Sequence, residues 1–264
     1  MQLIAADVGN SSTKVAVEHA AEDDRWCMET IFRGDEPLDF DLPSLNVGNE
    51  PAFWSVCSVN HDRQRRLNEW IQEYRPNDRY HLIEPQDVDL TTDVQSRDQL
   101  GRDRLVAAWM AVRLNDQNGP IVVIDAGTAV TIDLIDGDLV FQGGVIFPGT
   151  ESCFRSLSEF THALPELGRE DRPHTSDAAF SDVIGKSTTD AILKGVYQSQ
   201  ISAIRGIVNQ MASHSDGKTT IFLTGGGISD IANDLPPTWD YVPDLVLRGA
   251  RSIGRDLING LSRD

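Results

Sequence analysis

Residues 121–133 of this 264-residue chain read IVVIDAGTAVTID. A β-branched run ends at Asp125, a turn follows through AGT at 126–128, and an alternating apolar pattern then resumes. Two such runs on either side of a glycine turn are typical of adjacent β-strands. The stretch therefore predicts a buried strand, a tight turn and a second strand, with a carboxylate at the end of the first strand.

The same pattern opens the chain, where residues 3–17 read LIAADVGNSSTKVAV. Aligning Asp7 with Asp125 superposes Gly9 on Gly127, and polar residues follow both glycines. An internal repeat of this kind indicates two similar halves. We expect each half to present a turn whose backbone N–H groups and hydroxyls face an anion.

In each half a meander of strands is followed by strands that alternate with helices, which favours an α/β fold with mixed sheets and duplicated topology. The sequence Asn118-Gly119-Pro120 is the clearest break, so we predict a first domain at 1–118 and a second at 119–264. Besides the strand pair above, strands are expected at 3–7, 13–18, 26–31, 52–58, 80–83, 139–147 and 220–223, and helices at 61–74, 105–114, 150–160, 188–212, 228–235 and 247–261. A loop with a short helix inside it is expected at 34–50, and a surface loop at 169–176.

The charge balance limits the classes of partner. The chain has 41 acidic and 23 basic residues, a formal net charge of −18, whereas nucleic-acid binding rewards basic surfaces. No apolar run approaches the ~20 residues of a membrane span, and we recognise no signal peptide. Cys27, Cys57 and Cys153 show no metal-ligand spacing, and their odd number argues against a disulfide framework. We therefore expect a cytoplasmic protein that binds neither nucleic acid nor membrane.

The first turn has the composition of a phosphate-binding loop. Glycine lets N–H groups approach phosphate oxygens, hydroxyls add donors, and a lysine adds positive charge. Asp7, at a strand end, is a candidate ligand for Mg²⁺, directly or through water. An ordinary hairpin explains the same composition, but the match with the turn at Thr128 favours two turns that face one cleft and clamp a nucleotide. The candidate residues are Asp7, Val8, Gly9, Asn10, Ser11, Ser12, Thr13 and Lys14.

Two further glycine motifs are open to structural or functional interpretations. TGGG at 224–227 lies at a strand-to-helix junction and is either a closely packed helix start or a platform for adenosine. GGVIFPG at 143–149 is interpreted as a strand with a bulge and a turn, to which we assign no chemistry. The histidines and cysteines form no cluster, so we predict no zinc site.

The charged motif Gly101-Arg102-Asp103-Arg104 precedes an apolar helix. A helix cap is one explanation for Asp103. The other is a general base between two guanidinium groups, which are suited to binding a carboxylate in a bidentate manner. Opposite charge from two arginines is expected to lower the pKa of Asp103. The carboxylate would then orient a hydroxyl more than deprotonate it, which phosphoryl transfer tolerates.

The motifs DVGNSSTK, GRDR, DAGTAVTID, GGVIFPG and TGGG, in this order, resemble type III pantothenate kinase, a family also described as Bvg accessory factor-like. The resemblance spans nearly the whole chain, down to PDLVLRG at 243–249. It implies the acetate and sugar kinase/Hsp70/actin superfamily, with duplicated ribonuclease-H-like domains, mixed five-stranded sheets and flanking helices that enclose ATP. It also implies phosphorylation of pantothenate to 4′-phosphopantothenate, the first step of coenzyme A biosynthesis.

The resemblance also implies roles for individual residues. ATP phosphates are expected from Asp7 to Lys14, and ATP also at Thr128. Asp125 matches the position that binds a monovalent cation, K⁺ or NH₄⁺, in the family. The ligands that the resemblance implies are therefore ATP, Mg²⁺ and the monovalent cation. Members of the family are typically homodimers.

Pantothenate is expected at Gly101, Arg102, Asp103 and Arg104, with Asp103 as proton acceptor and Arg104 on the substrate carboxylate. Thr188 matches a threonine that contacts pantothenate in the family. Thr189 takes that place if the register shifts by one.

One departure concerns the pantothenate pocket. The family usually has an aromatic residue seven positions before the GxDR glycine, often with a proline between, whereas this chain has Val94 and Arg97. Two alternatives therefore stay open. One is a kinase of the same superfamily that acts on another small hydroxyl compound, which Val94 favours. The other is a non-catalytic nucleotide-binding regulator, which would need neither Asp103 nor Arg104.

Overall fold

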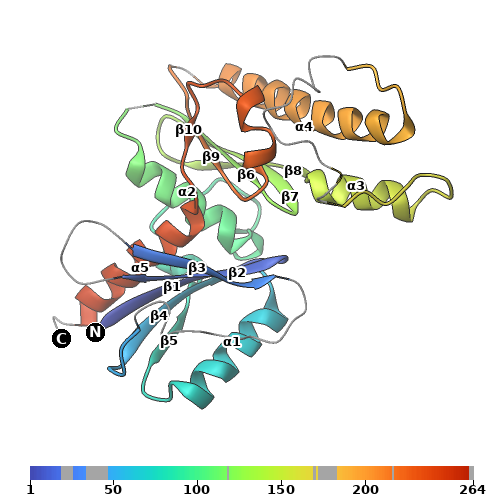
Figure 1. Cartoon of the computed structure of the whole chain (residues 1–264). Helices are drawn as coiled ribbons and strands as arrows, with labels where there is room; N and C mark the ends of the chain where they lie inside the picture. The colour runs from blue at the N-terminus through green and yellow to red at the C-terminus, as the bar shows by residue number, and fades with distance from the viewer. Residues whose placement is uncertain are drawn as a thin grey trace. The chain divides into compact units, whose positions relative to one another are not determined.

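A computed structural model describes residues 1–18, 26–33, 47–117, 119–168, 171, 183–215 and 217–261. The chain forms two compact units, each built on a five-stranded sheet (Figure 1). The first unit comprises Met1–Leu90, Gln95–Arg113 and Asp244–Asp264, and the second comprises Thr91–Val94 and Leu114–Pro243.

The sheet of the first unit has the strand order β3-β2-β1-β4-β5. β1 runs antiparallel to β2 and parallel to β4, so the sheet is mixed. β1 and β4 are almost entirely buried, as expected for central strands covered on both faces. The strands are β1 (Gln2–Val8), β2 (Ser12–Glu18), β3 (Trp26–Arg33), β4 (Ala52–Ser58) and β5 (Arg79–Leu82).

Helix α1 (His61–Tyr74) packs against this sheet. Asn60 starts the helix, because its side chain accepts a hydrogen bond from a first-turn backbone N–H at 3.1 Å. Leu67 and Ile71 are four residues apart and therefore share one helix face. Both are buried in the same core cluster as Trp54 of β4.

The C-terminal helix α5 (Leu245–Leu261) packs on β1 and β4 of the first unit. Ser55 Oγ of β4 donates a hydrogen bond to the Ala250 carbonyl of α5 at 2.7 Å. The contacts therefore group Asp244–Asp264 with the first unit. The division differs in this respect from the predicted C-terminal domain at 119–264. Helix α2 (Arg102–Leu114) belongs to the same unit.

The second sheet repeats the topology of the first. Its strand order is β10-β9-β6-β7-β8, with β6 antiparallel to β7 and parallel to β9. Taken from the β8 edge, this order is β8-β7-β6-β9-β10, so β6 to β10 correspond in turn to β1 to β5 in position and direction. The predicted duplication is therefore confirmed. The strands are β6 (Ile121–Ala126), β7 (Ala129–Ile135), β8 (Phe141–Pro148), β9 (Thr220–Thr224) and β10 (Asp240–Tyr241).

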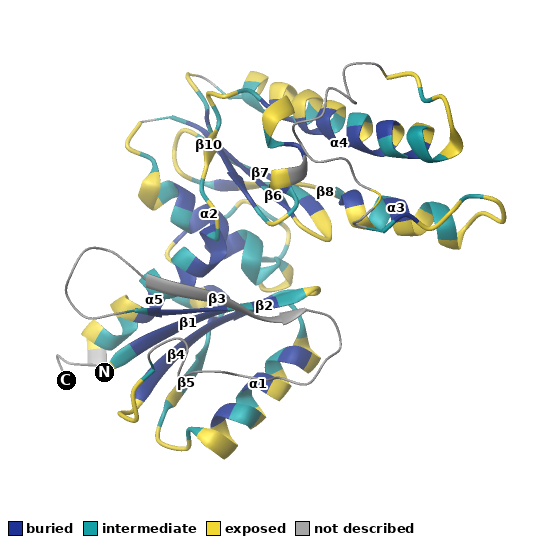
Figure 2. Cartoon of the chain, in the orientation of Figure 1, coloured by how far each residue is buried: buried dark blue, intermediate teal, exposed yellow. Residues whose placement is uncertain are grey.

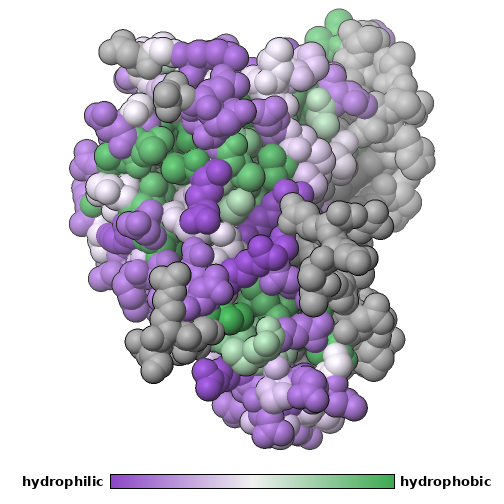
Figure 3. All heavy atoms as spheres, turned by 90° about the vertical axis from the view of Figure 1, so that its left-hand side faces the viewer, coloured by the Kyte–Doolittle hydropathy of each residue, from purple (hydrophilic) through white to green (hydrophobic). Residues whose placement is uncertain are grey.

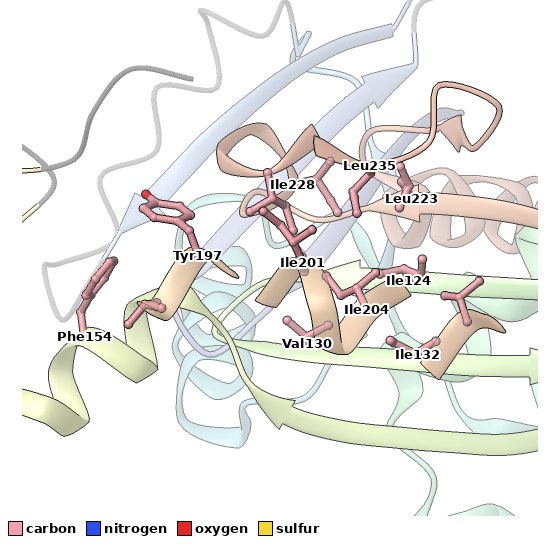
Figure 4. Close-up of a cluster of buried hydrophobic side chains, with 14 of the residues drawn as sticks. Ile124, Val130, Ile132, Phe154, Tyr197, Ile201, Ile204, Leu223, Ile228 and Leu235 are labelled. Carbon is pink, nitrogen blue, oxygen red and sulfur yellow. The ribbon is translucent and has the colours of Figure 1, made fainter. Parts of the chain in front are cut away.

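Helices α3 (Thr150–Glu159) and α4 (Thr188–Ser213) complete the second unit. The buried residues of α4 recur at helical spacing along one side, where Figure 2 shows them in dark blue. Ile201 and Ile204 of α4 share a core cluster with Ile124 of β6, and Figure 4 shows these side chains close together. Burial of this apolar stripe explains why a long helix forms here.

Two elements differ from the sequence predictions. The helix expected at 228–235 consists of two 3₁₀ turns, Ile228–Asp230 and Ala232–Asp234, because its hydrogen bonds join residues three apart rather than four. Strand β10 has only two residues, too few to show an alternating pattern. The loops expected at 34–50 and 169–176 lie largely outside the described residues.

None of the described helices combines the length and the apolar composition needed to cross a membrane. Figure 3 shows purple, hydrophilic residues over much of one face, with green, hydrophobic residues between them. Exposed hydrophobic residues among charged ones are normal for a protein surface.

Candidate active site

The turn between β1 and β2 carries the predicted phosphate-binding residues. Asp7 pairs with Lys14 across the antiparallel strands, so both side chains flank the turn. Gly9 N–H donates a hydrogen bond to the Ser12 carbonyl at 2.9 Å, which closes the turn. Of the predicted residues, Asn10 and Ser11 are exposed, Asp7, Gly9, Ser12 and Lys14 are partly buried, and Val8 and Thr13 are buried.

Lys14 forms an ion pair that the sequence did not indicate. Its Nζ donates to Asp244 Oδ1 at 2.7 Å, and the two side chains are 23% and 11% exposed. Asp244 directly precedes α5 and has a φ of 59°. An aspartate just before an apolar helical pattern is a typical cap. The sequence could therefore have marked Asp244, but not its partner 230 residues away.

Asp103 lies in the first turn of α2, where its Oδ1 accepts a hydrogen bond from the Arg104 backbone N–H at 2.8 Å. The first backbone bond of the helix runs from Leu105 N–H to the Gly101 carbonyl at 3.1 Å. A Cβ at residue 101 would lie 2.6 Å from Asp103 Oδ1, closer than such atoms approach. Glycine at this position therefore lets the carboxylate lie over the start of the helix.

Burial raises the pKa of Asp103 above its ordinary value. The Arg104 backbone N–H and guanidinium charge act in the opposite direction but are weaker than the loss of solvation. The expectation that two arginines lower the pKa of Asp103 is therefore wrong. A carboxylate with a raised pKa is a stronger base, so Asp103 is better suited to accept a proton than the sequence suggested.

Arg102 is paired with a protein carboxylate. Its Nη2 lies 2.5 Å from Glu84 Oε2, and Glu84 N–H donates to Asp87 Oδ2 at 2.8 Å. His81 Nε2 lies 2.8 Å from the same Asp87 oxygen. The Nε of Arg102 is buried without a hydrogen-bond partner among the described residues. The side chain of Arg102 is thus tied to the segment that follows β5.

Cys57 is a buried cysteine whose pKa is affected by acidic residues of the first unit. It lies opposite Asp7 in the parallel β1–β4 pair and is fully buried. The pKa of its thiol is raised well above the ordinary value, first by burial and then by the negative charges of Asp7 and Asp103. Arg102 partly offsets this effect. Asp7, Asp103 and Arg102 of the first unit therefore all lie within electrostatic range of this thiol.

Arg97, which stands where the family often has proline, holds the loop before α2. Its guanidinium donates to the carbonyls of Pro85 at 3.0 Å and Val88 at 2.6 Å, and also to that of Leu90. Val94 belongs to the second unit, where it lies beside Gly143 of β8. The departure from the family pattern thus affects a loop anchored by one arginine.

Asp125 is the last residue but one of β6 in the second unit, as Asp7 is of β1 in the first. Gly225, which follows β9, has a φ of 95°. A Cβ there would lie 2.4 Å from both Asp125 Oδ1 and the Ala126 carbonyl oxygen. The glycine is therefore required by its backbone conformation and by the close approach of these oxygens. The TGGG motif thus packs against the strand end that carries Asp125.

Thr128 is exposed in the turn between β6 and β7. Its carbonyl accepts hydrogen bonds from Gly149 N–H at 3.0 Å and from Ser152 Oγ at 2.6 Å. Gly149 ends the GGVIFPG motif. The structure shows that this motif and the start of α3 anchor the Thr128 turn.

Thr188 is the first residue of α4 and is exposed, whereas Thr189 is partly buried. Ser187 caps this helix, with its Oγ accepting a hydrogen bond from Asp190 N–H at 3.1 Å. Asp125, Thr128 and Thr188 all belong to the second unit. The phosphate turn and the GRDR motif belong to the first.

Among the described residues there is no group of three or more metal-ligating side chains that could hold a metal ion. Asp7 nevertheless fits Mg²⁺, which is commonly bound by one or two carboxylates together with substrate phosphates and water. Asp125 Oδ1 and the Ala126 carbonyl meet in the space that a Cβ of Gly225 would fill. Oxygen atoms of this kind suit a hard monovalent cation.

Comparison with solved structures supports the fold. The activator of the 2-hydroxyisocaproyl-CoA dehydratase from Clostridium difficile is 12% identical, with a TM-score of 0.53 over 100% of this chain and 98% of its own. A Sinorhizobium meliloti protein described as a candidate 2-dehydro-3-deoxygalactonokinase is 14% identical, with a TM-score of 0.55 over 97% and 96%. The fold is thus that of actin-like ATPases and sugar kinases.

Comparison at the sequence level is more specific. The family described as type III pantothenate kinase matches residues 3–210. A type III pantothenate kinase of Caulobacter vibrioides is 33% identical over 97% of this chain and 97% of its own. The type III pantothenate kinase of Desulfovibrio desulfuricans is 28% identical over 96% of each chain. The chain therefore belongs to the type III pantothenate kinase family.

Proposed function

We propose that this chain transfers the γ-phosphate of ATP to the terminal hydroxyl of pantothenate and so forms 4′-phosphopantothenate, the first step of coenzyme A biosynthesis. Membership of the type III pantothenate kinase family, matched over residues 3–210, is the observation that carries this proposal. The partly desolvated Asp103 and the charged turn at Lys14 supply the groups that such a reaction needs.

Asp103 is the proposed catalytic residue. Its carboxylate would orient the terminal hydroxyl of pantothenate and accept its proton as the new P–O bond forms. The raised pKa supports this role, because a more basic carboxylate accepts a proton more readily. Phosphoryl transfer has a loose transition state that depends mainly on positioning and charge stabilisation. Asp103 therefore has to hold the hydroxyl in line with the γ-phosphate.

The residues from Asp7 to Lys14 would bind the phosphates of ATP. Turn N–H groups and hydroxyls donate hydrogen bonds to oxygens, and Lys14 adds a positive charge. Thr128 would contact ATP as its counterpart does in the family. Mg²⁺ at Asp7 and K⁺ or NH₄⁺ at Asp125 would neutralise phosphate charge when bound.

Arg104 is the proposed partner of the pantothenate carboxylate, because a guanidinium matches a carboxylate with two parallel hydrogen bonds. Gly101 and Arg102 would line the same part of the pocket, and Thr188 would contact the substrate. By analogy with the family we also propose a cytoplasmic homodimer.

Product analysis tests the proposal. The purified protein is incubated with MgATP and pantothenate, and the products are separated and weighed by mass spectrometry. We expect one phosphate added to the terminal hydroxyl and an equal amount of ADP. A panel of other small hydroxyl compounds serves as the control for specificity. Phosphorylation of another panel member in preference to pantothenate would contradict the proposed substrate.

A further inference from the structure

The ion pair between Lys14 and Asp244 joins the phosphate turn to the start of α5. The two atoms are 2.7 Å apart, and both side chains are largely withdrawn from solvent. A partly buried pair at this distance is screened less by salt than a surface pair. Asp244 is therefore a persistent neighbour of the lysine that the proposed reaction places on the phosphates.

The backbone of Asp244 is held in an uncommon conformation. Its φ of 59° lies in the left-handed region, which Asp and Asn adopt more readily than most residues other than glycine. Its carbonyl accepts the Arg248 N–H at 2.9 Å, which begins α5. Such conformations persist only where the surrounding structure imposes them.

Helix α5 supplies that surrounding structure. It packs on β1 and β4, the strands that carry Asp7 and Cys57. The hydrogen bond from Ser55 Oγ to the Ala250 carbonyl, at 2.7 Å, fixes the helix to β4. Through α5, Asp244 is thus held against the same sheet that carries the phosphate turn.

Lys14 needs such a partner for its position. A lysine side chain has a flexible four-carbon stem, so one strand position does not fix its ammonium. Asp7 lies across the strand pair on one side, and Asp244 accepts a hydrogen bond from the ammonium on another. The negative charge of Asp244 also offsets the attraction of Lys14 for phosphate. The carboxylate therefore orders the lysine at the expense of net attraction for ATP.

We infer that Asp244 is a positioning residue that holds the Lys14 ammonium at the phosphate turn and acts on the rate of transfer rather than on ATP affinity. The inference rests on the proposed function, in which Lys14 contacts the transferred phosphate. A misplaced ammonium would still attract ATP but would stabilise the transition state less.

Two variants test the inference. Asp244→Gly removes the carboxylate and suits a φ of 59°, so the start of α5 stays unstrained. Asp244→Asn keeps the shape and an acceptor oxygen but removes the charge. Asp240→Asn, on the exposed strand β10, is the matched control.

We expect kcat to fall roughly 10- to 100-fold in Asp244→Gly, as for a misplaced catalytic group, and by a smaller factor that still exceeds twofold in Asp244→Asn. The KM for ATP should stay unchanged or decrease, and Asp240→Asn should behave as wild type. If circular dichroism shows that Asp244→Gly does not fold, the kcat and the KM for ATP of Asp244→Asn are compared with those of wild type instead. A kcat within twofold of wild type in folded variants, or a higher KM for ATP at unchanged kcat, would overturn the inference.

A second readout does not depend on turnover. Acylation of Lys14 by acetic anhydride, followed by mass spectrometry, should be several-fold faster in Asp244→Gly, because the variant lacks the carboxylate that the Lys14 ammonium contacts at 2.7 Å in wild type. Equal acylation in wild type and variant would also overturn the inference. Absence of pantothenate phosphorylation by wild type would instead contradict the proposed function.

Discussion

The carboxylate of Asp103 lies directly over Gly101, so that a Cβ at residue 101 would come within 2.6 Å of Asp103 Oδ1. Any side chain at 101 must displace either the carboxylate or the first turn of α2. The glycine of the GRDR motif therefore serves the geometry of the base.

Gly101→Ala should lower kcat for pantothenate phosphorylation by roughly 10- to 100-fold, since small displacements of a catalytic group have effects of this size. The KM for ATP should change little, because the phosphate turn joins β1 and β2 and is not part of α2. Gly195→Ala is the matched control, because Gly195 is exposed within α4 and an added Cβ would meet nothing within 4 Å. It should keep full activity and gain about 0.5–1 kcal/mol of stability. Full activity of Gly101→Ala would contradict the placement of Asp103.

Asp103→Asn should lower kcat by roughly 10²- to 10⁴-fold, the usual contribution of a positioned base.

Asp103→Asn should not lower the thermal stability at neutral pH. Burial raises the pKa of Asp103, so above its ordinary value of about 3.9 the folded chain binds more protons than the unfolded chain. Stability contributed by this group therefore decreases as pH rises through the window above 3.9. The neutral asparagine avoids that loss.

Thermal unfolding at several pH values checks the direction of this pH dependence. The melting temperature of Asp103→Asn should equal or exceed that of wild type at pH 7, and the difference should shrink as the pH falls toward the ordinary carboxyl pKa. The wild-type kcat/KM for pantothenate should show an acid limb with its midpoint above that pKa. If Asp103→Asn had a lower melting temperature than wild type at pH 7, and this difference disappeared at low pH, the raised pKa of Asp103 would be contradicted.

Gly225→Ala should damage the strand end that carries Asp125. The backbone φ of 95° is strained for alanine, and its Cβ would meet Asp125 Oδ1 and the Ala126 carbonyl at 2.4 Å. We expect a loss of about 1–3 kcal/mol in the free energy of unfolding and a loss of activation by K⁺. Gly226→Ala has open space for its Cβ and is the control. Equal K⁺ activation in both folded variants would argue against a cation at Asp125.

Glu84→Gln should raise the KM for pantothenate several-fold without changing the KM for ATP. Glu84 Oε2 lies 2.5 Å from Arg102 Nη2, and removal of its charge would leave the guanidinium without its carboxylate partner. Glu73→Gln, at an exposed position on α1, is the control. Steady-state kinetics with each substrate varied separately makes the measurement. An effect on ATP alone would show that Arg102 lies nearer the phosphates.

The duplicated fold was predictable because its signal is local. Strands of β-branched residues around the turns at Gly9 and Gly127 repeat the same order of polar residues, and each half then repeats the same strand directions. The place of α5 was not predictable in this way. Its apolar face indicates that it packs against another element, but only contacts such as Ser55 to Ala250 show that this element is the sheet of the first unit.

The functional site, too, could be predicted only where its signal is local in the sequence. Glycine turns and the GRDR motif mark short stretches whose spacing is visible in the sequence. The pKa of Asp103 depends instead on burial, which the sequence of α2 does not reveal, and the simple count of nearby arginines predicted the wrong direction. The contact between Lys14 and Asp244 spans 230 residues and follows from the packing of α5. Cys57 gains its surroundings only when β4 pairs with β1.

Pantothenate-dependent kinase activity is measured as ADP formation from MgATP in K⁺, with and without pantothenate, for wild type and Asp103→Asn purified in the same way. We expect rapid ADP formation that requires pantothenate in wild type and is nearly lost in folded Asp103→Asn. ADP formation by wild type that is the same with and without pantothenate, or an undiminished pantothenate-dependent rate in Asp103→Asn, would contradict this expectation.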